Sequence, residues 1–134
     1  MDKTRLLKLA DLLEADAANP KGVKFDLSEW GTSQTKRAKI GCGTTACAVG
    51  LACISGAFKE DGLGFDIDKT DPAVYEICPR FAGSYGFYAI EGFFDIDDLT
   101  ARRLFSMHSY EQKEQKGQEG ERAVAKRIRE FVAR

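Results

Sequence analysis

The sequence predicts a helix-dominated α+β fold, a single globular domain over residues 1–134 with about five helices and a small antiparallel ribbon. Three observations indicate this class. Both ends of the chain have the periodicity of amphipathic helices, two short segments alternate with a period of two, and the centre is apolar and rich in small residues. A chain of 134 residues is long enough for one hydrophobic core.

The first predicted helix covers residues 3–18, because its apolar residues recur at helical spacing. Asn19-Pro20 followed by Gly22 ends it, since proline cannot continue the hydrogen-bond ladder. Its buried face is predicted to comprise Leu6, Leu9, Leu13 and Ala17.

Two segments alternate as half-buried strands do, residues 23–27 and 63–67, and we expect them to pair in a two-stranded ribbon. The polar residues 29–39 between them are predicted to form a loop. Pro72 is expected to open a helical turn that Cys78-Pro79 closes.

Residues 44–58 are predicted to form a buried helix, because the segment has almost no polar face. Thr44 is the expected N-cap. Gly43, Cys47 and Gly50 form a narrow stripe on this helix, which lets another backbone approach closely. Close packing would explain Gly50, which costs roughly 1 kcal/mol of helix propensity.

Two more helices are expected in the second half, over residues 83–94 and 98–107, with Asp97 as the N-cap of the latter. Residues 111–120 contain no apolar side chain and are predicted to be a solvated linker before the C-terminal helix. That helix covers residues 121–132, and its inner face is predicted to comprise Val124, Ile128, Phe131 and Val132.

The segment from Gly41 to Gly50 carries the sharpest chemical feature, a cysteine at the predicted start of the central helix. The positive end of a helix dipole favours thiolate, so Cys42 is a candidate nucleophile. Its histidine partner would be His108, the only histidine in the chain. The competing interpretation is that the cysteines are reduced thiols that fill the core. A papain-type protease is excluded, because the spacing from Cys42 to Cys47 is wrong for it.

Neither a metal site nor a cofactor site is predicted. The C-x4-C spacing of Cys42 and Cys47 is not repeated by Cys53 and Cys78, and the acidic runs lack the glycine and glutamate of a calcium loop. The basic side chains of the C-terminal helix are offset by Glu119, Glu121 and Glu130, so a solvated face is expected there. A net charge of -1 argues against nucleic acid as a partner.

The chain is expected to be cytoplasmic. Its first residues are charged and no apolar signal core follows them. The longest mostly apolar run, residues 46–58, is too short to cross a bilayer, so no membrane partner is expected.

Four motifs occur in an order that resembles a set of small bacterial and phage proteins, mostly of unassigned function. They are a Phe-x-x-x-x-Trp strand, a C-G-T-x-x-C-x-x-G segment, an aromatic helix that runs into a Leu-Phe helix, and an Ala-x-Arg-Ile helix end. In this chain they lie at 25–30, 42–50, 93–105 and 125–128. The resemblance implies a shared fold and brings no activity with it.

Two hypotheses for function follow. The first is a small cytosolic accessory or interaction protein, of phage or prophage origin, that binds a protein partner. The alternative is a cysteine-dependent hydrolase or transferase that uses Cys42 with His108.

Overall fold

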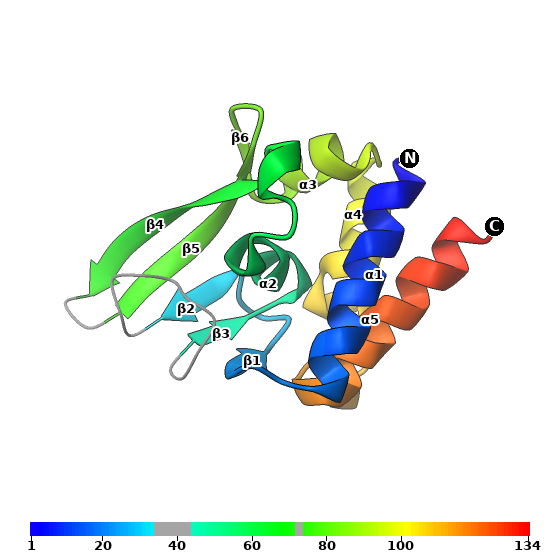
Figure 1. The fold of residues 1–134 in the computed structure, drawn as a ribbon, viewed down its shortest axis with the longest axis horizontal. Helices are drawn as coiled ribbons and strands as arrows, with labels where there is room; N and C mark the ends of the chain where they lie inside the picture. The colour runs from blue at the N-terminus through cyan, green and yellow to red at the C-terminus, as the bar shows by residue number, and fades with distance from the viewer. Residues whose placement is uncertain (34–43, 72–73) are drawn as a thin grey trace.

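The first and last helices of the chain lie on one side of the molecule and the longest strands of a mixed sheet on the other, with a central helix between them (Figure 1). The computed structural model describes residues 1–33, 44–71 and 74–134. Within them the α-helices are α1 (Lys3–Ala18), α2 (Ala48–Ser55), α3 (Gly86–Phe94), α4 (Asp98–Phe105) and α5 (Gly117–Val132). The strands are β1 (Val23–Phe25), β2 (Gly31–Ser33), β3 (Thr44–Ala46), β4 (Gly64–Asp71), β5 (Val74–Phe81) and β6 (Ser84–Tyr85). Three short 3-10 helices are η1 (Lys59–Asp61), η2 (Met107–Ser109) and η3 (Gln112–Glu114). The predicted α+β class with about five helices is confirmed.

The sheet is larger than the predicted ribbon and is not purely antiparallel. Its strand order is β1-β3-β2-β5-β4, with β6 paired to β5. β1 and β3 run parallel, and the other neighbours are antiparallel. The predicted pairing of residues 63–67 with 23–27 is wrong, because β4 pairs with β5 in a hairpin. A hairpin closes a far shorter loop, so it loses less chain entropy than a pairing across forty residues.

The helical turn expected before Pro79 is also wrong, because β5 passes straight through this proline. Among the described residues, β2 pairs with Tyr75 and Glu76 of β5 and β6 pairs with Arg80 and Phe81, so no strand is paired with Pro79 on this edge of β5. A proline without an N–H is tolerated in a strand where that edge is open. Pro72 lies outside the described residues.

Helices α1 and α5 lie side by side on the face away from the hairpin (Figure 1). The predicted inner face of α1 is confirmed, since Leu6, Leu9, Leu13 and Ala17 are fully buried. Asp2 caps α1 by accepting from the Arg5 amide. In α5, Val124 and Ile128 are fully buried, whereas Phe131 and Val132 are partly exposed.

The segment predicted as a linker, residues 111–120, contains η3 and the first turn of α5. The Gln115 side chain of this segment forms hydrogen bonds to backbone carbonyl groups of the preceding residues. Gln115 Nε2 donates to the carbonyl oxygens of Met107 and Tyr110, at 3.1 Å each. Gly120 is buried where a Cβ would lie 2.9 Å from the Phe25 ring. Local hydrogen bonding, which apolar periodicity does not register, therefore orders this stretch.

The central helix is shorter than predicted, because its first residues form β3 instead. Thr44–Ala46 pair with both β1 and β2, and β-branched threonine suits a strand. Cys47, rather than Thr44, is the N-cap of α2, and its Sγ accepts from the Gly50 amide at 3.4 Å. Gly56, with φ 75°, ends the helix in the left-handed conformation. The predicted loop over 29–39 contains β2, and its residues beyond Ser33 lie outside the described residues.

The close approach expected at Gly50 is present. A Cβ built on Gly50 would lie 1.5 Å from the carbonyl oxygen of Trp30, which is far inside van der Waals contact. The α2 backbone therefore rests directly on the chain that enters β2, and only glycine leaves the necessary space.

We expect Gly50→Ala to destabilise the protein by about 3 kcal/mol or more, because backbone must move to admit one methyl group. Gly92→Ala is the matched control. Its Cβ would meet the Phe81 ring at an ordinary 3.5 Å, so helix propensity should stabilise α3 by up to about 1 kcal/mol. Urea unfolding of both variants measures the difference. Equal stability of Gly50→Ala and the parent would contradict the close contact.

Candidate functional site

The thiol hypothesis pairs Cys42 with His108, and the structure describes only the second of these residues. Cys42 lies outside the described residues. His108 lies in η2 with its side chain exposed, and its amide donates to Ser106 Oγ. The structure therefore does not test the proposed pair of Cys42 and His108, which stays a prediction.

The other three cysteines are free thiols, as predicted. Cys47 and Cys53 are buried. Burial raises the pKa of Cys47 to about 11 and that of Cys53 to about 12, although the Gly50 amide opposes the shift at Cys47. A thiol with so high a pKa carries almost no thiolate at neutral pH and is a poor nucleophile. These two cysteines fill the core, as the competing interpretation held.

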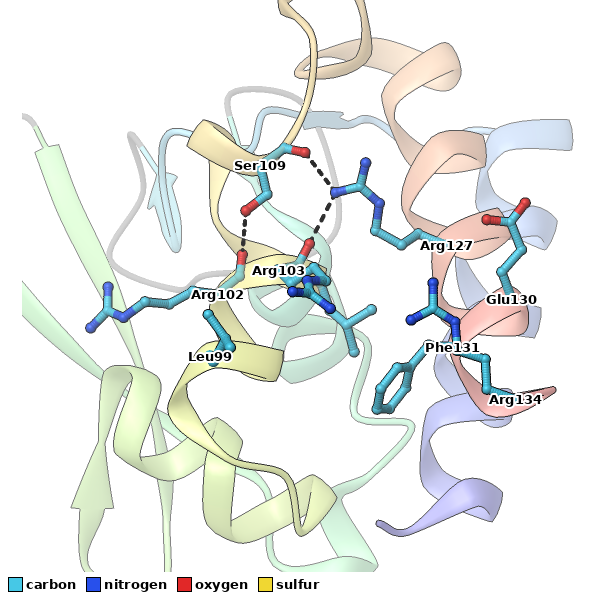
Figure 2. Close-up of a pocket in the computed structure, with 9 residues that line it drawn as sticks. Leu99, Arg102, Arg103, Ser109, Arg127, Glu130, Phe131 and Arg134 are labelled. Carbon is cyan, nitrogen blue, oxygen red and sulfur yellow. Dashed lines mark hydrogen bonds between the residues drawn. The ribbon is translucent and has the colours of Figure 1, made fainter.

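A groove of about 520 Å³ lies between α4 and α5 and has a different chemistry (Figure 2). One wall carries Leu99 and Arg103, one turn apart on α4. The other wall is a stripe with i, i+3, i+4, i+7 spacing at the end of α5. It comprises Arg127, Glu130, Phe131 and Arg134. Leu99 is 66% exposed, which is high for a leucine, and Phe131 is partly exposed.

The arginines that line the groove make different contacts. Arg127 is tied to the backbone, because its Nη1 donates to the carbonyl oxygens of Arg103 and Ser109 at 3.0 and 2.6 Å (Figure 2). Arg102 extends away from α5, pairs with Asp98 and lies over the Phe87 ring. Arg103 and Arg134 form no ion pair within the described residues. With Glu130 as the one acidic lining residue, the groove has a net positive charge.

A second polar feature lies at the contact between α1 and α5. Asp16 is 8% exposed and Glu121 is 2% exposed, and Asp16 Oδ2 and Glu121 Oε2 have no hydrogen-bond donor in the described protein. Burial, a hydrogen bond to Asp16 and the charge of Asp16 raise the pKa of Glu121 to about 9. Glu121 is therefore a neutral acid at pH 7 that donates its proton to Asp16.

The balance of acidic and basic residues predicted a solvated position for Glu121, although its spacing in the sequence indicates the inner face of α5. Glu121 precedes Val124 by three residues and Ile128 by seven, so it belongs to the inner stripe of α5. The prediction of a solvated face followed the balance of acidic and basic residues along the helix and not this spacing. The arginine groove could not be predicted from the sequence. Helical periodicity within α4 and α5 does not show that Arg103 of α4 and Arg134, beyond α5, line the same groove.

Within the described part of the chain, no group of three or more His, Cys, Asp or Glu side chains is placed to hold a metal ion. Among the same residues, no helix has the length and apolar character required to cross a membrane.

Burial predicts slow alkylation of Cys47 and Cys53. In the folded protein at pH 8 we expect iodoacetamide to modify them about 100-fold more slowly than in urea-unfolded chain, because the thiolate is suppressed and the sulfur is covered. Peptide mass mapping over time measures each site, with partly exposed Cys78 as the internal reference. Modification of Cys47 as fast as Cys78 would contradict this prediction.

The carboxyl pair predicts an unusual pH dependence of stability. Because the folded-state pKa of Glu121 lies near 9 and the ordinary value is 4.5, the folded chain retains a proton that the unfolded chain releases. Stability should therefore fall as pH rises from about 4.5 to about 9. The side chain in Glu121→Gln can donate an N–H to Asp16 and does not titrate. The variant should therefore be more stable than the parent by up to about 3 kcal/mol at pH 7 and by almost nothing at pH 4.

Chemical unfolding at pH 4, 7 and 8.5 tests this prediction, with exposed Glu119→Gln in the same helix as the control. A Glu121→Gln variant that is less stable than the parent by the same amount at every pH would show instead that Glu121 is ionised.

Comparison with protein-family models, curated proteins and solved structures finds no match for this chain. The resemblance to small bacterial and phage proteins therefore stays a prediction from motifs. Function must be argued from the chemistry of the groove and of the carboxyl pair.

Proposed function

We propose that this chain is a small accessory protein that acts by binding a partner protein in the groove between α4 and α5. The partner contributes a segment that carries carboxylates and at least one apolar side chain. The observation that carries this proposal is the combination of two arginines that form no ion pair with any described residue, Arg103 and Arg134, with the exposed side chain of Leu99.

Each part of the groove favours one part of such a segment. An exposed leucine beside a half-buried phenylalanine gains free energy when a partner's apolar side chain covers it. Arginine presents a planar fork of donors that matches a carboxylate. Arg127 is already held by the backbone oxygens of Arg103 and Ser109, so this wall is preorganised and little side-chain entropy is lost on binding.

A protein segment fits the groove better than a nucleic acid does. Bases bind single-stranded sites mainly by stacking on exposed aromatic rings, and Phe131 is the one aromatic residue that lines this groove. The net charge of -1 supplies no general attraction for nucleic acid.

The proposal includes a cytoplasmic location for the protein and a phage or prophage origin. The free thiols of Cys47, Cys53 and Cys78 are ordinary in a reducing compartment and support a cytoplasmic location. A phage or prophage origin rests on the order of the four motifs.

The proposal is tested with a fluorescein-labelled synthetic helix that carries leucines at i, i+3, i+4 and i+7 and glutamates elsewhere. Fluorescence anisotropy should show saturable binding, and Arg103→Glu/Arg134→Glu should weaken it at least about tenfold through charge repulsion. Leu99→Ser should weaken it by about three- to tenfold, since it removes most of one apolar contact.

Lys21→Glu/Lys113→Glu is the matched control, because it changes the net charge equally at two exposed lysines outside the groove. Its binding should stay within about twofold of the parent at physiological salt. The proposal fails if both double variants bind alike, if the peptide does not bind, or if a single-stranded oligonucleotide binds the groove more tightly than the peptide.

A further inference from the structure

A separate pocket of about 510 Å³ lies where α5 begins, and the α4–α5 groove does not include it. β1 and the start of α5 supply most of its lining, with Glu121 among the lining residues. Gly117 stands one helical turn before Glu121 on the same face, and a Cβ there would meet nothing within 4 Å. The face of α5 above the Glu121 carboxyl is therefore open to a ligand.

One end of this pocket is acidic. The Glu121 side chain leans toward the start of α5, as helical side chains do, and its Oε2 has no donor in the described protein. Behind it lies the buried Asp16 of α1, which is hydrogen-bonded to Glu121 and does not itself line the pocket, and its Oδ2 has no hydrogen-bond partner in the described protein. The nearest cation on α5, Arg122, is directed to the Ala17 carbonyl oxygen. An ammonium group from a ligand would supply the missing donors.

The other end is basic. Lys116 is the N-cap residue of α5 and makes no side-chain capping bond, so the amides of Gln118 and Glu119 have no acceptor among the described residues. Lys24 and Lys116 both line this pocket and form no ion pair with any described residue. Asp26 also lines the pocket, but its Oδ1 is engaged by the amide and hydroxyl of Ser28. Free amides at a helix N-terminus together with two lysines favour a carboxylate.

We infer that this pocket binds a free α-amino acid, with its ammonium group on Glu121 and its carboxylate on the start of α5 and Lys116. Residues 117 and 121 are separated by about 6 Å along the helix axis. That separation suits a ligand whose two charged groups are one carbon apart and each hydrogen-bonded to the protein. Pro20, Val23 and Phe25 form an apolar wall beside it, so the amino acid has an apolar side chain.

Binding of an ammonium group should release a proton, because its charge stabilises the ionised form of Glu121. The proton leaves Glu121 and enters the buffer, and the Glu121 carboxylate then accepts from the ammonium group. This proton release provides a signature that a merely apolar ligand would not give.

Isothermal titration calorimetry with L-leucine and L-phenylalanine tests the inference, in two buffers of different ionisation enthalpy at pH 7. At least one amino acid should bind, with an apparent enthalpy that differs between the buffers. Isocaproate lacks the ammonium group of leucine and isoamylamine lacks its carboxylate, and each should bind at least about tenfold more weakly than leucine if leucine is the ligand. For phenylalanine the corresponding pair is hydrocinnamate and phenethylamine.

Two variants locate the site from its two ends. Asp16→Asn/Glu121→Gln keeps the shape of the acidic end, and Lys116→Gln removes one basic group. Each should weaken binding at least about tenfold, whereas Glu60→Gln, at an exposed side chain of η1 outside this pocket, should leave it within about twofold. The inference is overturned if neither amino acid binds at about 20 mM, if the truncated analogues bind equally well, or if Glu60→Gln weakens binding as much as the other variants. Arg103→Glu/Arg134→Glu should not affect this site, so its outcome is independent of the α4–α5 groove.

Discussion

The contact between Gly50 and the carbonyl oxygen of Trp30 is the constraint on which the arrangement of helices and sheet depends. The Cys47 amide donates to the Glu29 carbonyl oxygen at 2.9 Å, and the Gly50 backbone rests on the next residue, Trp30. The chain that enters β2 is therefore held against the first turn of α2. Gly31 extends the same requirement to the sheet, because a Cβ there would lie 2.6 Å from Ile77 Cδ1 of β5. Two glycines thus fix the distance from α2 through β2 to β5.

The opposite side of the molecule depends on α1 and α5, whose contact combines apolar packing with charge. Leu13 and Ile128 are fully buried, which supplies the hydrophobic term. Arg129 of α5 donates to both Asp11 and Glu14 of α1 at the exposed edge of the contact. The buried pair of Asp16 and Glu121 opposes stability at neutral pH, since it keeps a proton bound against the bulk equilibrium. An apolar pair would be more stable there, so the carboxyl pair is better explained by ligand binding than by folding.

Much of the helical structure followed from local pattern, whereas the sheet did not. Helix α1 has the predicted bounds, and Asp97 caps α4 by accepting from the Thr100 amide as expected. These features depend on residues within one or two turns of each other. The parallel pairing of β1 with β3 depends on residues twenty-one apart, and the alternation that marks residues 23–27 as a strand does not show which segment they pair with. Thr44–Ala46 were predicted to be helical because they directly precede the apolar residues of a real helix. They form a strand instead, because they pair with β1 on one edge and with β2 on the other.

The arginine groove and the carboxyl pocket both lie on α5, about 24 Å long by its sixteen residues, one toward each end. A shared helix does not by itself couple two sites, because coupling requires an element with two arrangements. α5 is held to α1 through Arg129 near its C-terminal end and through Gln118, which donates to the Ala17 carbonyl oxygen, near its start. Arg127 holds it to the end of α4. With three such attachments along sixteen residues, α5 has no free segment that a ligand at one end would shift. We therefore expect the two proposed sites to bind their ligands independently on one rigid helix.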